Sequence, residues 1–367
     1  MKIGTIKESK NKENRVALSP DVVKNFIKQG FECVIEKGAG LNSYFTDESY
    51  KNAGAEILNS ASEVCNACDV IVKVNAPSYD EIEKLKEGSI LVSLLYHLTN
   101  PALIAALNAK KISVFSTDAM PRISRAQSMD VLSSQSNLAG YKAVILAADH
   151  APKIFPMLMT AAGTITPARV VIFGAGVAGL QAIGTAKRLG AVVEVTDIRS
   201  ETKEQVESLG GKFISFDIGE VKTEGGYVKE AGEEVLKRQR EILKKHLATA
   251  DCVITTALIP GRKAPVLITE EMVNVMKYGS LIVDMAVEQG GNCELSKPDE
   301  IIERNGVKII GLTNLPGMLP QNASEGYAKN IYNFLTHLAT KDGMKWELEE
   351  EITKGTLICN KGEVLRS

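Results

Sequence analysis

Short runs of apolar, largely β-branched residues alternate along the chain with segments in which apolar residues recur at helical spacing. The runs predict strands, and the intervening segments, such as 101–111, predict helices. Residues 19–30 carry clear helix signals, with Ser19 as N-cap, Pro20 in the first turn and Gly30 as the stop. Regular alternation predicts an α/β fold whose parallel sheets are covered on both faces. The predicted strands are residues 2–7, 31–38, 69–74, 89–95, 111–116, 167–173, 191–197, 212–217, 251–257, 280–286 and 307–314.

Small and apolar residues at helical spacing predict a long helix over 133–150, where the alternation stops before it restarts. We expect this helix to leave a first domain and to enter a second one. A further helix, predicted over 320–339, would pack back on the first domain and make it discontinuous. The predicted domains are residues 1–136 with 315–367 and residues 137–314, and a length of 367 residues suits two such domains.

Charge and cysteine content narrow the functional classes. A formal net charge of −2 provides no basic field, so we expect no nucleic-acid partner. No apolar run approaches the ~20 residues of a membrane span, and no signal peptide is expected. The six cysteines are scattered, as in a reducing cytosol, and only Cys65 and Cys68 form a C-x-x-C pair. Without a second pair or a nearby histidine we expect no metal site, and interpret both thiols as packing residues, with redox or metal use as the alternative.

The segment from Phe173 to Asp197 consists of a predicted strand, a glycine turn, a helix, a second strand and an acid. Gly174, Gly176 and Gly179 form the G-x-G-x-x-G pattern of dinucleotide-binding turns. The first glycine permits the tight turn, the second lets a pyrophosphate approach the backbone, and the third lets the helix pack close to the strand. The N–H groups at the helix start would face the phosphates. We therefore expect two Rossmann-like domains linked by long helices, with a nucleotide-free α/β domain as the alternative.

Asp197 ends the second strand, at the distance from the turn at which an acid binds the adenosine ribose. Its carboxylate would accept hydrogen bonds from the ribose and would repel a 2′-phosphate, which favours NAD over NADP. Arg199, two residues further on, argues in the opposite direction because it could pair with a 2′-phosphate. The expected cofactor is NAD.

Residues 120–142, MPRISRAQSMDVLSSQSNLAGYK, form a polar loop that follows a predicted strand and leads into the long helix. A loop at the carboxyl end of a strand faces the ligand crevice of an open α/β sheet. Arg122 or Arg125 can donate to an amide oxygen, and Asp130 can accept from an amide NH₂; nicotinamide carries such an amide. Gln127 lies between them. A helix-capping cluster with surface salt bridges is the alternative interpretation.

This segment resembles the signature loop of the soluble NAD(H)-binding component of proton-translocating NAD(P) transhydrogenases. TTALIPG and MAVEQGGNCE resemble that family as well, and the similarity covers nearly the whole chain. Because no membrane helix is predicted, the chain resembles the separate first alpha subunit of three-chain transhydrogenases. The resemblance implies direct hydride transfer from NADH to NADP⁺ on a beta subunit, coupled to proton translocation by membrane-spanning subunits. It also implies a cytoplasmic homodimer, bound peripherally to the cytoplasmic face of the inner membrane.

The resemblance also implies roles for residues of the polar loop. Arg122, Gln127 and Asp130 match residues that position the nicotinamide and its ribose, and they are the predicted catalytic residues. Ser133 matches a serine that reaches the carboxamide.

Further roles follow from the same resemblance for the second domain. Gly226 and Tyr227 match a mobile loop that closes over bound nucleotide, although Val228 stands where alanine is usual. Leu258 matches a residue that lines the adenine or ribose. The predicted NAD site comprises Arg122, Gln127, Asp130, Ser133, Gly174, Gly176, Val177, Ala178, Gly179, Asp197, Ile198, Arg199, Gly226, Tyr227, Ala257 and Leu258.

Alanine dehydrogenases are similar in sequence and provide the alternative function. Arg15, Lys73 and His97 fall where those enzymes keep substrate-binding and acid–base residues, whereas Glu288 stands where they have an aspartate. Reduction of a keto acid needs a cation for the carboxylate and a group that moves a proton near neutral pH. Transfer between two nicotinamides needs neither. The complete transhydrogenase loop favours the first function, with Arg15 and Lys73 in structural ion pairs and His97 buried and hydrogen-bonded.

Overall fold

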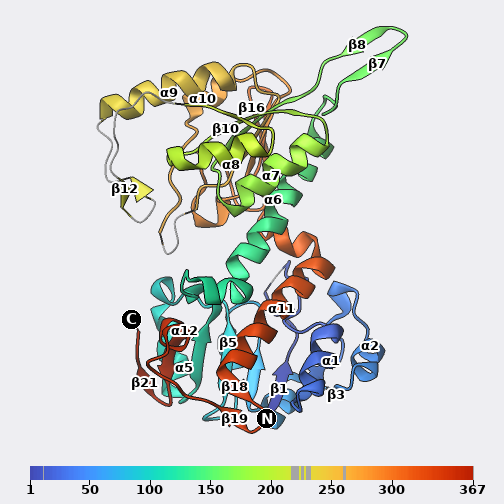
Figure 1. The fold of residues 1–367 in the computed structure, drawn as a ribbon, viewed down its shortest axis with the longest axis vertical. Coiled ribbons are helices and arrows are strands. Elements are labelled where there is room, and N and C mark those ends of the chain that lie inside the picture. Colours follow the sequence, from blue (N-terminus) through green and yellow to red (C-terminus); the bar gives the residue numbers. More distant parts are fainter. Residues whose placement is uncertain (11, 216–222, 225–226, 229–232, 259–261, 367) are drawn as a thin grey trace. The chain divides into compact units, whose positions relative to one another are not determined.

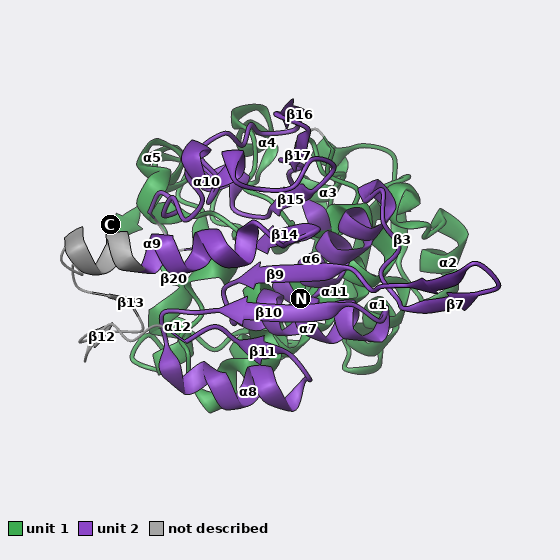
Figure 2. Ribbon diagram, turned by 90° about the horizontal axis from the view of Figure 1, so that it is seen from above, with its two compact units in different colours: residues 1–135, 316–367 green, residues 136–315 purple. Residues whose placement is uncertain are grey.

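The computed structural model describes residues 1–367 except 11, 216–222, 225–226, 229–232, 259–261 and 367. It separates into two compact units, each with its own sheet (Figures 1 and 2). Unit 1 comprises residues 1–135 and 316–367, and unit 2 comprises residues 136–315. The domain boundaries predicted from the sequence lie between residues 136 and 137 and between residues 314 and 315. Both units are α/β with mainly parallel sheets, which confirms the expected fold class.

Unit 1 contains an eight-stranded sheet in the order β21-β20-β6-β5-β4-β1-β2-β3. Strands β1 to β6 pair in parallel, whereas β20 joins β6 in the antiparallel sense and β21 follows. This antiparallel edge adds a detail that the predicted parallel sheet did not include. An antiparallel strand at an edge needs no crossover helix, and many otherwise parallel sheets carry one. The strands are β1 (Lys2–Thr5), β2 (Glu32–Glu36), β3 (Glu56–Leu58), β4 (Val70–Val72), β5 (Ile90–Ser93), β6 (Ser113–Ser116), β20 (Leu357–Asn360) and β21 (Glu363–Val364).

Two hydrophobic cores lie on the two faces of this sheet. Val70 of β4 belongs to one core together with Phe334 of the C-terminal helix α11, and its neighbour Ile71 belongs to the other. Helix α1 begins as its sequence predicts, because the Ser19 side chain accepts a hydrogen bond from the N–H of Val22. The helices of unit 1 are α1 (Pro20–Lys28), α2 (Asp47–Asn52), α3 (Ala61–Ala67), α4 (Tyr79–Lys84), α5 (Pro101–Ala109), α11 (Pro320–Leu338) and α12 (Glu351–Thr356).

Unit 2 contains a seven-stranded sheet in the order β11-β10-β9-β14-β15-β17-β16. Among the described strands of this sheet, β16 runs antiparallel to its neighbour β17 and the others pair in parallel. The chain runs outward from β9 to β11 and returns on the other side of β9 with β14. In open α/β sheets ligands bind at such a reversal, beside the carboxyl ends of the strands. The strands are β9 (Arg169–Phe173), β10 (Val192–Thr196), β11 (Lys212–Phe213), β14 (Cys252–Thr255), β15 (Leu281–Asp284), β16 (Ile301–Arg304) and β17 (Val307–Ile310).

The helices of unit 2 alternate with these strands. Helix α6 (Val131–His150) begins in unit 1 and ends in unit 2. A separate hairpin of β7 (Leu158–Thr160) and β8 (Gly163–Ile165) projects from unit 2 with its strand residues exposed (Figure 1). No helix in the described residues is long and apolar enough to cross a membrane. The remaining elements are α7 (Val177–Arg188), α8 (Lys203–Ser208), α9 (Glu233–Leu247), α10 (Glu270–Asn274), and the pairs β12 (Thr223–Glu224) with β13 (Tyr227–Val228) and, in unit 1, β18 (Ala339–Thr340) with β19 (Gly343–Met344).

The cysteines are buried free thiols. Cys65 in α3 and Cys68 directly after it pack in one core of unit 1. Burial raises the pKa of Cys65 to about 11 and that of Cys68 to about 12. Thiolate, the form that reacts or binds metal, is therefore scarce near neutral pH. Within the described residues, no group of histidines, cysteines and carboxylates has the arrangement of a metal site.

Candidate functional site

The turn after β9 depends on two of its glycines for steric reasons. Gly174 has a φ of 102°, in the left-handed region, and its N–H donates to the carbonyl of Thr196 over 2.8 Å. A side chain there would lie 2.5 Å from the Thr256 hydroxyl. At Gly179 a Cβ would lie 1.9 Å from the carbonyl oxygen of Gly174. Neither position accepts a larger residue without moving the strand or the helix.

Gly176, the middle glycine, faces open space. A Cβ at this position would have no heavy atom within 4 Å. Gly176 is the N-cap of α7, no side chain caps the helix, and the N–H of Leu180 donates to the Gly176 carbonyl. The N–H groups of Val177 and Ala178 come before it in the first turn, where no intrahelical acceptor exists. An anionic group could therefore approach the backbone here and be bound by these donors.

Asp197 follows β10 beside this turn, and 5% of its side chain is exposed. One oxygen accepts the Ala175 N–H at 2.7 Å and Nη2 of Arg199 at 3.0 Å. The other accepts the N–H and Nε of Arg199 at 2.8 and 3.0 Å. Burial alone would raise the pKa of Asp197, but these donors outweigh it and lower the pKa. The carboxylate is thus ionised, and the arginine suspected of binding a 2′-phosphate is paired with it. Ile198 between them is exposed.

The loop after β14 lies next to the glycine turn, because β14 pairs with β9 on the side opposite β10. The buried side-chain amide of Asn292 accepts from the N–H of Ala257 at 3.0 Å and donates to its carbonyl at 2.9 Å. Leu258 next to it is 41% exposed. Sequence reasoning missed Asn292 and also Thr256, whose hydroxyl donates to the carbonyl of Phe173. Thr256 lies in the TTALIPG motif and Asn292 in the MAVEQGGNCE motif, so these two motifs could have pointed to both residues.

The predicted closing loop is only partly described. Tyr227 lies in β13, which pairs with β12 in the antiparallel sense. Gly226 lies outside the described residues.

In unit 1 the polar loop forms a 3-10 helix, η4 (Ser124–Met129), that leads into α6. Arg122 and Gln127 are exposed, and no hydrogen-bond or ion-pair partner for the side chain of either is found among the described residues. Asp130 accepts hydrogen bonds from the N–H and hydroxyl of Ser133 at 3.0 and 2.6 Å, and so caps α6.

Arg125 of the same loop is already paired. Its guanidinium lies 3.3 Å from the carboxylate of Glu350 and 3.7 Å from that of Glu351, at the start of α12. Asp130 and Ser133 therefore cap a helix and Arg125 forms salt bridges, as the alternative interpretation of the loop predicted. Arg122 and Gln127 remain available to a ligand.

A second set of charged residues lies at the carboxyl ends of β1 and β4. Lys73 is 1% exposed, and its Nζ lies 3.1 Å from Glu81 and 3.4 Å from Glu8. Arg15 makes two bonds to the carboxylate of Glu13, at 2.8 and 2.7 Å. Burial opposes ionisation of Glu13, but the bonds from Arg15 outweigh it and lower its pKa to about 2. Both cations are neutralised by the chain's own carboxylates, as expected for structural ion pairs.

His97 does not fit the expectation of a buried, hydrogen-bonded side chain. It lies in η2 (His97–Thr99) and is only partly buried. Its Nδ1 is enclosed but has no hydrogen-bond partner among the described residues. Burial lowers the pKa of His97. His97 begins a short 3-10 turn, and its backbone carbonyl accepts the N–H of Asn100. Glu288, the residue that differs from the dehydrogenase pattern, lies in η6 (Val287–Gln289) of unit 2.

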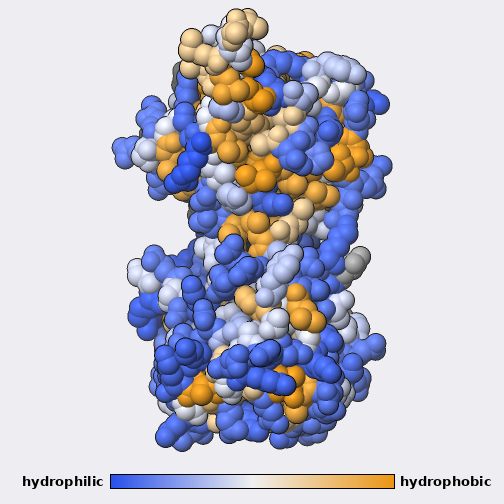
Figure 3. Space-filling view, turned by 90° about the vertical axis from the view of Figure 1, so that its right-hand side faces the viewer, coloured by the Kyte–Doolittle hydropathy of each residue, from blue (hydrophilic) through white to orange (hydrophobic). Residues whose placement is uncertain are grey.

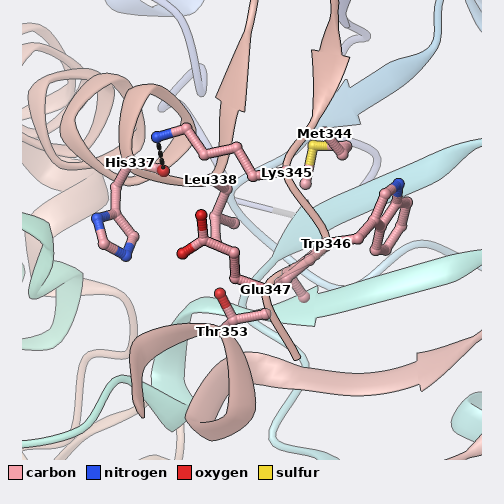
Figure 4. A pocket seen from close by; sticks show the side chains of 8 residues that line it. His337, Leu338, Met344, Lys345, Trp346, Glu347 and Thr353 are labelled. Atoms are coloured by element: carbon pink, nitrogen blue, oxygen red, sulfur yellow. Dashed lines mark hydrogen bonds between the residues drawn. The ribbon is translucent and has the colours of Figure 1, made fainter. Parts of the chain in front are cut away.

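Two cavities lie away from the glycine turn. One in unit 1 has a volume of about 10 Å³, enough for one water molecule, and Lys345 beside it donates to the carbonyl of His337 at 2.6 Å (Figure 4). A cavity of about 220 Å³ in unit 2 is lined by Lys153, Asp251 and Lys277. It lies at the amino ends of β14 and β15, at the edge opposite the glycine turn.

Comparison with known proteins matches both halves of the chain to one family. Residues 4–139 match the alanine dehydrogenase/PNT N-terminal domain, and residues 143–367 match the alanine dehydrogenase/PNT C-terminal domain. The first part of NAD(P) transhydrogenase subunit alpha from Rhodospirillum rubrum is 52% identical, over 100% of this chain and 98% of that protein. The crystal structure of transhydrogenase from Sinorhizobium meliloti superimposes with a TM-score of 0.92 at 44% identity, covering 99% of this chain and 100% of that one.

Alanine dehydrogenases are more distant relatives. The enzyme of Methanococcus maripaludis is 33% identical, over 93% of this chain and 88% of that protein. These similarities confirm the resemblance inferred from the sequence motifs. The chain belongs to the alanine dehydrogenase/PNT family, and it is more similar to the transhydrogenase alpha subunits of that family than to its alanine dehydrogenases.

Proposed function

We propose that this chain is the separate NAD(H)-binding alpha subunit of a proton-translocating NAD(P) transhydrogenase. The observation that carries the proposal is the 52% identity to the first part of a transhydrogenase alpha subunit, over the full length of this chain. The geometry of both units agrees with it. Unit 2 has an uncapped helix start and an ionised acid beside a glycine turn, and unit 1 presents an arginine and a glutamine without partners among the described residues.

The residues of the glycine turn fit a dinucleotide. The open space at Gly176 admits a diphosphate to the first-turn N–H groups of α7. Asp197 would accept hydrogen bonds from the adenosine ribose, and its negative charge would oppose a 2′-phosphate, so NAD is the proposed cofactor. Arg122 and Gln127 would orient the amide-bearing nicotinamide ring, and Asp130 and Ser133 would hold the start of α6 beneath it.

The proposed chemistry needs alignment rather than acid–base groups. When bound, NADH supplies a hydride to NADP⁺ held on a partner, and no protein oxygen or nitrogen has to change protonation. The chain would bind, orient and shield the reacting ring from water. The buried ion pairs of Arg15 and Lys73 agree with this function, because a dehydrogenase acting on a keto acid needs a cation that is free for the substrate carboxylate.

The partners would be an NADP-binding domain on a beta subunit and membrane-spanning subunits that move the proton. The chain would act in the cytoplasm, peripherally on the cytoplasmic face of the inner membrane.

A homodimer is proposed as well. The projecting hairpin exposes Met157, Leu158, Met159 and Ile165, with Met159 82% exposed. Figure 3 shows hydrophobic surface in the region of the molecule that carries this hairpin. Apolar side chains concentrated on one projecting element are typical of an interface.

Mixing experiments distinguish the two functions. The purified chain should bind NADH but oxidise it slowly with pyruvate and ammonium, and adding an NADP-binding transhydrogenase domain with NADP⁺ should start turnover. Rapid pyruvate-dependent oxidation by the chain alone would instead establish an alanine dehydrogenase. Binding of NADH without turnover in either mixture would indicate a non-catalytic NAD-sensing protein.

A further inference from the structure

The carbonyl group of Ser128, within the polar loop, is held from a distant segment of the chain. The side-chain amides of Asn330 and Asn333 on α11 donate to its oxygen at 2.8 and 3.0 Å. A carbonyl oxygen has two lone pairs, and both are used here. Asn330 lies 202 positions along the chain from Ser128, so this contact exists only in the folded unit 1.

Asn330 is itself fixed in orientation. It is 8% exposed, and its amide oxygen accepts the hydroxyl of Ser134 in α6 at 2.7 Å. Since the oxygen accepts from Ser134, the amide nitrogen has to point toward Ser128. Gln135 extends the connection, because its amide donates to the carbonyl of Ala323 on α11 at 3.0 Å.

Gln135 also bonds to the buried ion pair of Arg15 and Glu13. The Nη1 of Arg15 donates to the amide oxygen of Gln135 at 2.8 Å. Glu13 holds the other side of that guanidinium. Gln135 of α6 is therefore held on one side by Arg15 and on the other by the Ala323 carbonyl of α11.

We propose that Asn330 and Asn333 are positioning residues, which set the direction in which Gln127 presents its side chain to the nicotinamide ring. Gln127 directly precedes the held carbonyl, and its own side chain has no partner among the described residues. Its position is therefore set by its backbone. The inference rests on the proposed transhydrogenase function, and it assigns to α11 an indirect role in hydride transfer, exerted through the polar loop.

The test compares Asn333→Ala, Asn330→Ala and the control Asn322→Ala in the full chain. Asn322 also lies on α11 and is exposed, and its amide contacts only the neighbouring Glu325 among the described residues. Three quantities are measured: hydrogen–deuterium exchange of residues 126–130 without nucleotide, equilibrium affinity for NADH, and single-turnover transfer to NADP⁺ on an added NADP-binding domain. Thermal unfolding reports whether each variant is folded. Asn333 is only partly buried, so its variant tests the proposal even if Asn330→Ala does not fold.

We expect Asn333→Ala and Asn330→Ala to accelerate exchange over 126–130 and to slow transfer by about 10- to 100-fold, the range produced by a displacement of about 1 Å in an aligned pair. Affinity for NADH should change less than about threefold, because the amide of each asparagine donates to the Ser128 carbonyl and acts through the loop. Wild-type exchange and transfer in both asparagine variants would overturn the proposal, as would an equal loss in Asn322→Ala. A loss of NADH affinity with unchanged transfer would also overturn it. If the wild-type chain itself fails to transfer hydride, the proposed function fails, whereas the exchange result still reports whether α11 holds the loop.

Discussion

Replacing Asp197 by asparagine should abolish the proposed preference of this chain for NADH over NADPH. Asparagine can still accept the Ala175 N–H, which lies 2.7 Å from one carboxylate oxygen. Its NH₂ group would then face the donors of Arg199, which lie 2.8 and 3.0 Å from the other oxygen. Two donors cannot bond to each other, so Arg199 would keep only the bond from its Nη2 to the retained oxygen, which is 3.0 Å long with Asp197, and its guanidinium should become more available to a 2′-phosphate.

The size of the expected change in NADH affinity follows from the loss of the negative charge of Asp197. A hydrogen bond to a charged group contributes about 1.5–3 kcal/mol, which corresponds to about a 10- to 150-fold weaker affinity for NADH. Because Arg199 competes with the ribose for the same oxygens, the lower half of this range is expected. Affinity for NADPH should rise, since repulsion between Asp197 and the 2′-phosphate is removed and a cation becomes more available.

Equilibrium titration of both coenzymes against Asp197→Asn measures the two affinities directly. Glu201→Gln is the matched control, because it removes the same charge from an exposed residue of the nearby turn η5 (Ser200–Thr202). A ratio of NADH to NADPH affinity that stays at its wild-type value would refute the role of Asp197. So would an equal change in the ratio for Glu201→Gln.

Three further predictions concern the turn, the buried pair and the hairpin. Gly179→Ala should destabilise the chain in thermal unfolding because its Cβ would meet a carbonyl at 1.9 Å, whereas Gly176→Ala should keep native stability and weaken NADH binding by titration. Glu13, with a pKa lowered to about 2, should stabilise the fold fully above about pH 4.5 and lose about 3 kcal/mol as the pH falls toward 2; acid unfolding of Glu13→Gln should show a flatter loss over that range. Met159→Glu should shift the sedimentation of the proposed dimer toward that of the monomer without changing NADH affinity. If the variant sediments as the wild-type dimer does, the hairpin does not form the interface.

The amino-acid sequence by itself determined the features that depend on neighbours along the chain. Alternating apolar periodicity was enough for an α/β fold, because strands and helices differ in the spacing of their buried residues. The G-x-G-x-x-G turn could also be recognised locally, since Gly174 needs a left-handed backbone and Gly179 makes a close contact with it within the same turn. The short edge strand β20 was missed because its four residues carry no signal of which sheet they join.

Only the tertiary structure decided which polar groups of the candidate site are free and which are already bonded. By residue chemistry alone Arg122 and Arg125 are equivalent candidates, and only the family resemblance favoured Arg122. In the structure α12 supplies carboxylates to Arg125, and no partner for Arg122 is found among the described residues. Asn330 could not be connected with the loop at all until α11 packed against it. Hydrogen bonds and ion pairs act over a few ångströms, and residues hundreds of positions apart come within that distance only when the sheet and its helices have assembled.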